Sequence, residues 1–452
     1  VDLACLAQPI CKWSYQIRRP EDIAWAISRA FYIAKSGRPG PVVIDFPKNI
    51  QQALTEYEPQ HIDFIRSYNA YPQPDEEKTR LAAELINKSK KPIALVGHGV
   101  EIGNAQEELK EFLEKADIPA ARTLMGLSAL PSDHPLNMGM LGMHGNYAPN
   151  IKEQECDLLI AIGMRFSDRV TSNVATYAKQ AKIIHLDIDA SEIDKNVKTD
   201  IAIVADCKES LPKITALVHK NSHKEWIDSF KPLYETERER VIEPAIHPKG
   251  KFLLMAEVVN AVAEATDDNT VMVNDVGQNQ MFSCRYFKYK RKLSVVTSGG
   301  LGTMGFGLPA AIGAKIGQPG RQVCLFVGDG GLQMTIQELG TIFEYKVPVK
   351  IILLNNNFLG MVRQWQELFF HKHYSETPMV NPDFVALCKA YGIKGEDVVE
   401  RKDLGQAIKR MLDSDEAYLL NVCIQPYNMV FPMTPAGSNV DNIMLNATEH
   451  YI

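Results

Sequence analysis

Short apolar runs of strand length alternate with helix-like segments along most of this 452-residue chain. Between residues 75 and 218 such runs occupy Lys91–Val96, Asp157–Ile162 and Lys182–Ile188, and a helix is expected at Ala105–Ala116. A continuously apolar strand is buried on both faces, as in parallel sheets whose strands are joined by helices. The pattern therefore predicts an α/β protein built of successive doubly wound parallel-sheet domains.

A second series of the same kind begins after residue 250. Strands are expected at Thr270–Asn274, Ser294–Thr297, Gln322–Val327 and Val349–Leu354, and helices at Leu308–Ile316 and Thr335–Tyr345. The pattern continues to about Cys423, and an irregular tail that packs over this domain is expected after it. Two polar, proline-containing stretches, 51–74 and 219–251, are predicted to be linkers.

The first 60 residues offer one amphipathic helix, Pro20–Ser36, and one apolar strand, Val42–Phe46. This is too little for a domain, which typically has about 100–150 residues. We therefore expect 1–60 to be the C-terminal remnant of a larger domain, with an exposed strand edge. The predicted division continues with a domain at 61–218, a linker at 219–250, a domain at 251–430 and a tail at 431–452.

Composition and charge disfavour several functional classes. The net charge of -6 leaves no basic excess for a nucleic-acid surface. No run of 18 apolar residues suggests a membrane span, and the start lacks the pattern of a secretory signal. The eight cysteines lack metal-ligand spacing and are expected to be reduced core residues. We expect a cytoplasmic protein with small-molecule partners, and neither nucleic acid nor membrane.

The strongest chemical signal is Gly328–Gly331 after one strand and Asn355-Asn356 after the next. Both carboxyl ends of such strands face one crevice, where ligands of parallel sheets bind. Asp329 and Asn356 offer the oxygen ligands that Mg²⁺ prefers, with phosphate and water completing the shell. The glycines admit backbone N–H groups to a diphosphate, toward which the helix expected from Thr335 would point. Two unrelated turns are the alternative, which the buried strand before each half disfavours.

This pair of motifs resembles the signature of thiamine-diphosphate enzymes. Six further motifs resemble the acetohydroxyacid synthase (acetolactate synthase) catalytic large subunit, and they lie at 37–41, 141–145, 165–170, 297–305, 308–313 and 360–365. The resemblance covers essentially the whole chain, and it implies a thiamine-diphosphate-binding fold with a central Rossmann-like FAD domain. It also implies that pyruvate is decarboxylated on thiamine diphosphate and that the hydroxyethyl group is ligated to pyruvate or 2-ketobutyrate. That reaction is the first common step of branched-chain amino acid biosynthesis.

The resemblance implies roles residue by residue. Asp329, Asn356 and the main-chain carbonyl of Phe358 would hold Mg²⁺. The cofactor would be lined by Gln278, Asn279, Gly302, Thr303, Met304, Gly328, Asp329, Gly330, Gly331, Asn356, Asn357, Phe358, Leu359, Gly360 and Met361. Met304 would press the aminopyrimidine toward the thiazolium carbon, although a gap-filling core methionine is the alternative.

Two residues would face the second substrate. Trp365 matches the residue that favours 2-ketobutyrate over pyruvate, since one methylene in an apolar pocket is worth about 1–3 kcal/mol. Arg169 matches the arginine that meets the substrate carboxylate with a bidentate fork. The alternatives are a core tryptophan and a surface arginine paired with Asp168. With Gln278 and Met304, these two residues are the catalytic candidates.

The middle domain is similar to the family's FAD-binding domain. Gly97-His98-Gly99 alone lacks the full dinucleotide motif and could be a strand-ending turn. The set that matches the family's FAD contacts is Arg66, Gly97, Gly99, Thr123, Leu124, Leu141, Gly142, Met143, His144, Gly163, Met164, Arg165, Phe166, Ser167, Arg169, Asp187, Ile188, Asp206 and Cys207. The flavin would take no net redox step. Ser167 stands where most members have aspartate.

Two departures from the family matter. Asn279 stands where histidine is usual, so it can donate a hydrogen bond to phosphate but cannot titrate near neutral pH. The glutamate that activates the cofactor would lie before residue 1, because Glu21, Glu56 and Glu58 lack its strand-end setting. The chain alone is therefore expected to bind cofactors without turnover.

The resemblance also implies a homodimer or dimer of dimers, with a separate regulatory small subunit as a further partner. Two alternatives to an acetolactate synthase stay open. One is an FAD-linked thiamine-diphosphate enzyme, either a pyruvate oxidase or a glyoxylate carboligase. The other is a non-catalytic, truncated chain that only binds the cofactors.

Overall fold

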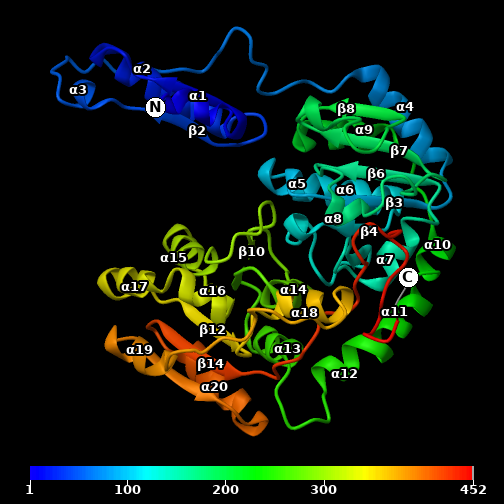
Figure 1. The fold of residues 1–452 in the computed structure, drawn as a ribbon. Coiled ribbons are helices and arrows are strands. Elements are labelled where there is room, and N and C mark those ends of the chain that lie inside the picture. The colour runs from blue at the N-terminus through cyan, green and yellow to red at the C-terminus, as the bar shows by residue number, and fades with distance from the viewer. Residues whose placement is uncertain (450–452) are drawn as a thin grey trace.

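The computed structural model describes residues 1–449 and contains three parallel-sheet units that follow one another along the chain (Figure 1). One sheet has two strands and the other two have six strands each. Every strand pair within these sheets runs parallel, and helices connect the strands. The α/β class that the alternating pattern predicted is confirmed.

The N-terminal unit holds two strands, one more than predicted. Its elements are α1 Leu3–Ala7, β1 Trp13–Gln16, α2 Ile23–Lys35, β2 Val42–Asp45 and α3 Lys48–Gln51. Strand β1 pairs with β2 from Trp13↔Val42 to Gln16↔Asp45, so the first strand escaped prediction and one edge of β2 is covered. Its four residues alternate aromatic and polar side chains and make no continuous apolar run. The segment 52–75 that follows contains neither helix nor named strand, as predicted.

The middle unit has the strand order β5-β4-β3-β6-β7-β8. Its strands are β3 Pro92–Val96, β4 Ala120–Arg122, β5 Asn137–Met140, β6 Leu158–Ile162, β7 Lys182–Asp187 and β8 Ile201–Val204. Its helices include α4 Glu76–Lys88, α5 Gly99–Ile102, α6 Gln106–Ala116, α7 Tyr147–Lys152, α8 Asp168–Thr171 and α9 Cys207–Leu217. The chain leaves β3 toward β4 on one side and returns to β6 on the other. Ligands of open parallel sheets bind at such a reversal, beyond the carboxyl ends of the strands.

The third unit has the strand order β10-β9-β11-β12-β14-β13. Its strands are β9 Val271–Asn274, β10 Val295–Val296, β11 Val323–Gly328, β12 Lys350–Asn355, β13 Lys394–Val398 and β14 Tyr418–Cys423. Its helices are α13 Met255–Ala265, α14 Gln278–Tyr286, α15 Gly307–Gly317, α16 Asp329–Met334, α17 Leu339–Tyr345, α18 Gly360–Phe369, α19 Phe384–Ala390 and α20 Arg401–Asp413.

Successive residues of the central strands enter two separate cores. In β11, Phe326 packs with α13 and α20 on one face, whereas Leu325 and Val327 pack with α15 and α19 on the other. Side chains of a strand alternate between faces, so a continuous apolar run supplies both cores.

Two expected features differ in the structure. The helix predicted from Thr335 is preceded by α16, which begins at Asp329, because packing outweighs the low helix propensity of two glycines. The segment expected to be a linker, 219–251, is largely helical, with α10 Lys224–Asp228, α11 Lys231–Glu237, a π-helical turn at Arg238–Ile242 and α12 Glu243–Ile246. The charged composition of this segment suggested a linker, but Trp226 and Phe230 form an apolar face that is buried against the middle unit.

The tail after β14 is irregular, as predicted, but it packs on the middle unit rather than only on the third. Figure 1 shows it running beside α7 and α11. Met433 and Met444 exchange backbone hydrogen bonds of 2.9 Å, and Thr434 N donates to Met143 O at 2.8 Å. Val440 is buried in the core of the middle unit. Among residues 1–449, no helix combines the length and apolar character that crossing a bilayer demands.

Candidate functional site

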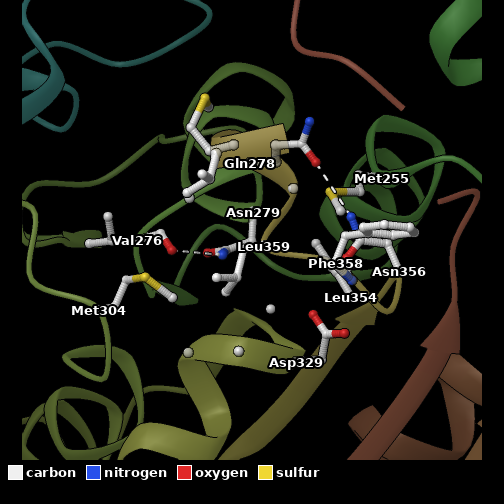
Figure 2. A pocket seen from close by; sticks show the side chains of 17 residues that line it. Met255, Val276, Gln278, Asn279, Met304, Asp329, Leu354, Asn356, Phe358 and Leu359 are labelled. Atoms are coloured by element: carbon white, nitrogen blue, oxygen red, sulfur yellow. Dashed lines mark hydrogen bonds between the residues drawn. The ribbon is translucent and has the colours of Figure 1, made fainter. Parts of the chain in front are cut away.

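A narrow pocket lies at the carboxyl ends of β9, β11 and β12 (Figure 2). The predicted residues that line it are Gln278, Asn279, Met304, Gly328, Asp329, Gly330, Gly331, Asn356, Phe358, Leu359, Gly360 and Met361. Further lining residues that the sequence did not single out are Met255, Val276, Gly277, Leu354 and Val362. The two strand-end motifs therefore meet in one place. Of the remaining predictions, Gly302 lines a neighbouring cavity, whereas Thr303 and Asn357 are exposed and line neither.

Asp329 and Asn356 present oxygen atoms to this pocket. Asp329 is 1% exposed, and burial raises the pKa of its carboxyl group. Its Oδ2 accepts a 2.7 Å hydrogen bond from Nδ2 of Asn381, which also donates to Asn355 and Asn357 at 3.0 Å. A cation beside Asp329 would favour the charged form that burial disfavours. The arrangement can thus hold a hard metal ion.

The amide of Asn356 belongs to a second group of contacts. Its Nδ2 donates to Gln278 Oε1 at 3.5 Å, and its Oδ1 accepts from the main-chain N–H of Phe358 at 3.2 Å. Gln278 in turn donates to Gln364 Oε1 at 3.0 Å and to Asn428 O at 2.6 Å. These contacts fix the start of α14 against the loop that follows β12.

Two glycines of the pocket, Gly331 and Gly360, leave no room for side chains. A Cβ on Gly331 would lie 2.3 Å from Asp275 Oδ1, and one on Gly360 would lie 2.1 Å from Gln278 Oε1. Asn279 lines the same pocket, and its buried Oδ1 has no hydrogen-bond partner within residues 1–449. The Asn279 Nδ2 donates to Val276 O at 3.4 Å. Close backbone approach, an amide oxygen without a partner and a buried carboxylate fit a metal–diphosphate head group.

Two organising residues escaped the sequence analysis. Asp275 is fully buried, and its carboxylate accepts hydrogen bonds from the N–H groups of Val276, Gly305 and Gly307 at 2.8, 3.2 and 2.7 Å. It therefore fastens the loop that carries Met304 to the end of β9. Its position directly after a buried strand was the available signal, as it was for Asp329. Asn381 lies in an irregular segment and offered none.

A second cavity of about 850 Å³ lies beyond the carboxyl ends of β3, β4, β6 and β7. The predicted residues that line it are Gly97, Gly99, Thr123, Leu124, Leu141, Met143, His144, Gly163, Met164, Arg165, Ser167, Arg169, Asp187, Ile188, Asp206 and Cys207. Residues 37–39 and 298–302 are among the other residues that line it, so all three units contribute. Arg66 is exposed on the linker, Phe166 is buried beside His185, and Gly142 packs against Arg169 O; none of the three lines the cavity.

The strand ends at the bottom of this cavity approach each other closely. A Cβ on Gly97 would lie 2.4 Å from Gly163 O, and Gly163 has a φ of 57°, in the left-handed region. His144 is buried in the wall with Nε2 unpartnered in the described chain. Burial, with Arg285 and Arg169 nearby, lowers the pKa of His144 to about 3, so its ring is neutral. A neutral, unpartnered imidazole nitrogen can hydrogen-bond to a polar ligand.

The two residues predicted to face the second substrate do not line the narrow pocket. The guanidinium of Arg169 is 66% exposed at the rim of the larger cavity, 3.7 Å from Asp168 Oδ2. Trp365 is half-buried and packs against Phe369, with ring centroids 4.9 Å apart and ring planes tilted by 50°, in a cluster that includes Met143. Their roles stay predictions. In the N-terminal unit and linker, Glu21, Glu56 and Glu58 are all exposed.

Comparison with known proteins covers nearly the whole chain. Residues 275–422 match the family model described as the C-terminal TPP binding domain of thiamine pyrophosphate enzymes, and residues 79–214 match the model of their central domain. The chain is 40% identical over 446 residues to the acetolactate synthase large subunit of Lactococcus lactis subsp. lactis, spanning 98% of this chain and 76% of that protein. It is 39% identical over 440 residues to the isozyme 2 large subunit of Escherichia coli, spanning 97% and 78%. It is 38% identical over 450 residues to acetolactate synthase 1, chloroplastic, of Nicotiana tabacum, spanning 97% and 67%.

Proposed function

This chain belongs to the family of acetolactate synthase large subunits, which are thiamine pyrophosphate enzymes, and we propose that the pocket at Asp329 and Asn356 is its reaction site. The reaction joins two 2-ketoacids. Pyruvate loses carbon dioxide, and its remaining two-carbon unit is ligated to a second pyruvate or to 2-ketobutyrate. The observation that carries the proposal is the convergence of the two strand-end motifs within the segment that matches the cofactor-binding domain.

In the proposed complex, the side chains of Asp329 and Asn356 and the carbonyl of Phe358 hold Mg²⁺. Gln278, Asn279 and the N–H groups at the start of α16 bind the diphosphate. The bound cofactor supplies the nucleophilic carbon that takes up pyruvate and the electron sink that accepts charge when carbon dioxide leaves. Met304 borders the same pocket and would orient the aminopyrimidine.

The larger cavity is proposed to bind FAD. Its volume of about 850 Å³ is at the upper end of the range for ligand sites, and it lies where the strand order of the middle unit reverses. The unpartnered Nε2 of His144 supports a polar ligand there. The proposed flavin takes no net redox step, because joining two 2-ketoacids with loss of carbon dioxide balances without an oxidant.

The second ketoacid is proposed to meet Trp365 and Arg169. Met361 lines the cofactor pocket, and Trp365 lies four residues further along α18, on the same helix face. Arg169 is accessible, so its guanidinium can receive a carboxylate without breaking a buried contact.

Partners are proposed from the family. The relatives named above as large subunits suggest a separate small subunit for this chain, and a second copy is proposed to complete the site. We further propose that these 452 residues alone bind cofactor but do not turn over, because Glu21, Glu56 and Glu58 are exposed and line neither cavity. A cytoplasmic location also stays a prediction.

The proposal is tested by calorimetric titration of the chain with thiamine diphosphate in the presence of Mg²⁺. Asp329→Ala should abolish this binding and leave FAD binding intact, since the two cavities have separate polar walls. Asp413→Ala is the matched control, because Asp413 is exposed on α20 and pairs only with Lys409 in the described chain. Unchanged diphosphate affinity in Asp329→Ala would overturn the site. Acetolactate formed from pyruvate by the loaded chain alone would overturn the expected inactivity and support the reaction.

A further inference from the structure

Arg363, in the first turn of α18, lies within a cage of three aromatic rings. Its guanidinium carbon is 4.3 Å from the ring centre of Tyr427, 4.5 Å from that of Tyr374 and 5.2 Å from that of Phe358. All three distances are within the range of about 6 Å over which a cation and an aromatic face attract. The Arg363 side chain is only 15% exposed, although the rings of Tyr374 and Tyr427 face solvent. The rings therefore form much of the surroundings of the cation.

The three rings belong to three segments that meet beside the pocket. Phe358 lies in the loop after β12, Tyr374 in the segment between α18 and α19, and Tyr427 in the segment after β14. The rings of Phe358 and Tyr427 are also in contact, with centroids 5.8 Å apart. None of the three rings lies on a helix or named strand, so the packing of the rings adds to whatever backbone contacts hold these segments together.

Backbone hydrogen bonds join two of these segments at the pocket. Leu359 N donates to Thr377 O, and Met379 N donates to Asn357 O, both at 2.9 Å. From the same segment, Asn381 reaches Asp329. Any displacement of the segment 374–381 would thus be transmitted to the loop 356–360 and to the carboxylate opposite it.

We propose that Arg363 is a positioning residue for the metal site, an inference that rests on the proposed function. Through its contacts with the three rings it fixes Phe358, whose carbonyl is the proposed third ligand, and with it the loop that presents Asn356. Mg²⁺ requires near-ideal octahedral geometry at about 2.0–2.1 Å, so small displacements of these ligands weaken its binding. The planar guanidinium can stack on several rings, which the compact ammonium of lysine cannot do equally well.

The competing explanation is an ordinary ion pair with Glu367. The closest approach is 3.8 Å, between Arg363 Nη1 and Glu367 Oε2, which is too long for a hydrogen bond. Pairs of this kind one helical turn apart contribute little. The carboxylate of Glu367 also accepts a hydrogen bond from the hydroxyl of Tyr374. Glu367→Gln removes the ion pair and leaves an amide oxygen that can still accept from Tyr374, so it separates the two explanations while the cage is kept.

The experiment measures thiamine diphosphate affinity of the 452-residue chain by calorimetry over a series of Mg²⁺ concentrations. For Arg363→Gln we expect about tenfold weaker binding at low Mg²⁺, a loss typical of a partly desolvated cation–π contact. High Mg²⁺ should restore the affinity, because the defect is in ligand placement and not in the diphosphate contacts. Arg363→Lys should restore part of the affinity, and Glu367→Gln should bind like the wild type. A merely structural role would lower the unfolding midpoint without this rescue by Mg²⁺.

Tyr427→Leu supplies a second variant, since it removes one exposed ring and leaves the charge in place. It should weaken binding in the same Mg²⁺-dependent way, even if Arg363→Gln fails to fold. Wild-type affinity in Arg363→Gln at every Mg²⁺ concentration would overturn the proposal, and so would a loss in Glu367→Gln as large as that in Arg363→Gln. A wild-type chain without Mg²⁺-dependent binding would instead overturn the proposed function, and the role of Arg363 with it.

Discussion

The buried ion pair between Arg285 and Glu237 offers a stringent test of how the units are held together. Arg285 lies on α14 of the third unit, Glu237 ends α11, and both side chains are 1% exposed. Arg285 Nη1 also donates to the carbonyl of Gly145 at 2.7 Å, on the middle unit. Glu237 accepts from Asn146 Nδ2 at 3.0 Å and from Tyr147 N at 2.8 Å. One pair of charges therefore links the third unit, the helical connection and the middle unit.

Arg285→Met should destabilise the folded chain by about 3–5 kcal/mol, because removing one partner of a buried pair leaves the other charge uncompensated. The carbonyls of His144 and Gly145 lose a donor in the same variant, a loss that overlaps with the first and does not simply add. Replacing both partners, in Arg285→Met with Glu237→Leu, removes the stranded charge. The double variant should consequently be more stable than the sum of the two single changes predicts.

The assay is a double-mutant cycle of urea unfolding followed by tryptophan fluorescence, to which the buried Trp226 contributes. A chain of several units need not unfold in one step, so the cycle applies to the transition that both single variants shift. The partly exposed pair Arg410 and Glu396 is the matched control, expected to show about 1 kcal/mol of coupling or less. A coupling between Arg285 and Glu237 no larger than that of the control would refute the reasoning.

Three further predictions concern single positions. Burial raises the pKa of Glu153 from 4.5 to about 8. Between pH 4.5 and pH 8 the folded chain therefore binds more protons than the unfolded chain, and its stability falls as the pH rises through this range. The urea midpoint of Glu153→Gln, taken relative to that of the wild type, should therefore be higher at pH 8 than at pH 5. Gly331→Ala should abolish thiamine diphosphate binding in calorimetry, since its Cβ would meet Asp275. Its control is Gly405→Ala, where the added Cβ has open space and should raise the free energy of unfolding by about 0.5–1 kcal/mol. Trp365→Leu in an active assembly should lower the preference for 2-ketobutyrate in a competition assay by a factor worth about 1–3 kcal/mol; an unmoved product ratio would place Trp365 in the core only.

The sequence was sufficient for most strands that are apolar throughout, because burial on both faces produces a continuous apolar run; β8, which is apolar but only four residues long, was not predicted. It was also sufficient to bring Asp329 and Asn356 together, since parallel neighbours must end at the same edge. It failed for β1, whose aromatic and polar residues alternate, and for the start of α16, where two glycines hide a helix that tertiary packing stabilises.

The parts of the site that depend on irregular segments could not be predicted. Asn381 approaches Asp329 across a loop of no regular pattern, and the cage around Arg363 joins residues that are far apart in the chain. Local sequence periodicity does not predict such long-range contacts, because they depend on side-chain packing between distant segments. For the same reason Arg66 and Phe166 could be matched by motif and still lie away from the cavity.

The tail that crosses from the third unit to the middle unit has a mechanical consequence. Its ladder between Met433 and Met444 and its bond from Thr434 to Met143 act as a clasp, whose two ends are fixed on different bodies. Separating the units therefore requires these hydrogen bonds to break as well as the contacts between the units themselves. The tail thus couples the motion of the two units mechanically, although no strand is shared between their sheets.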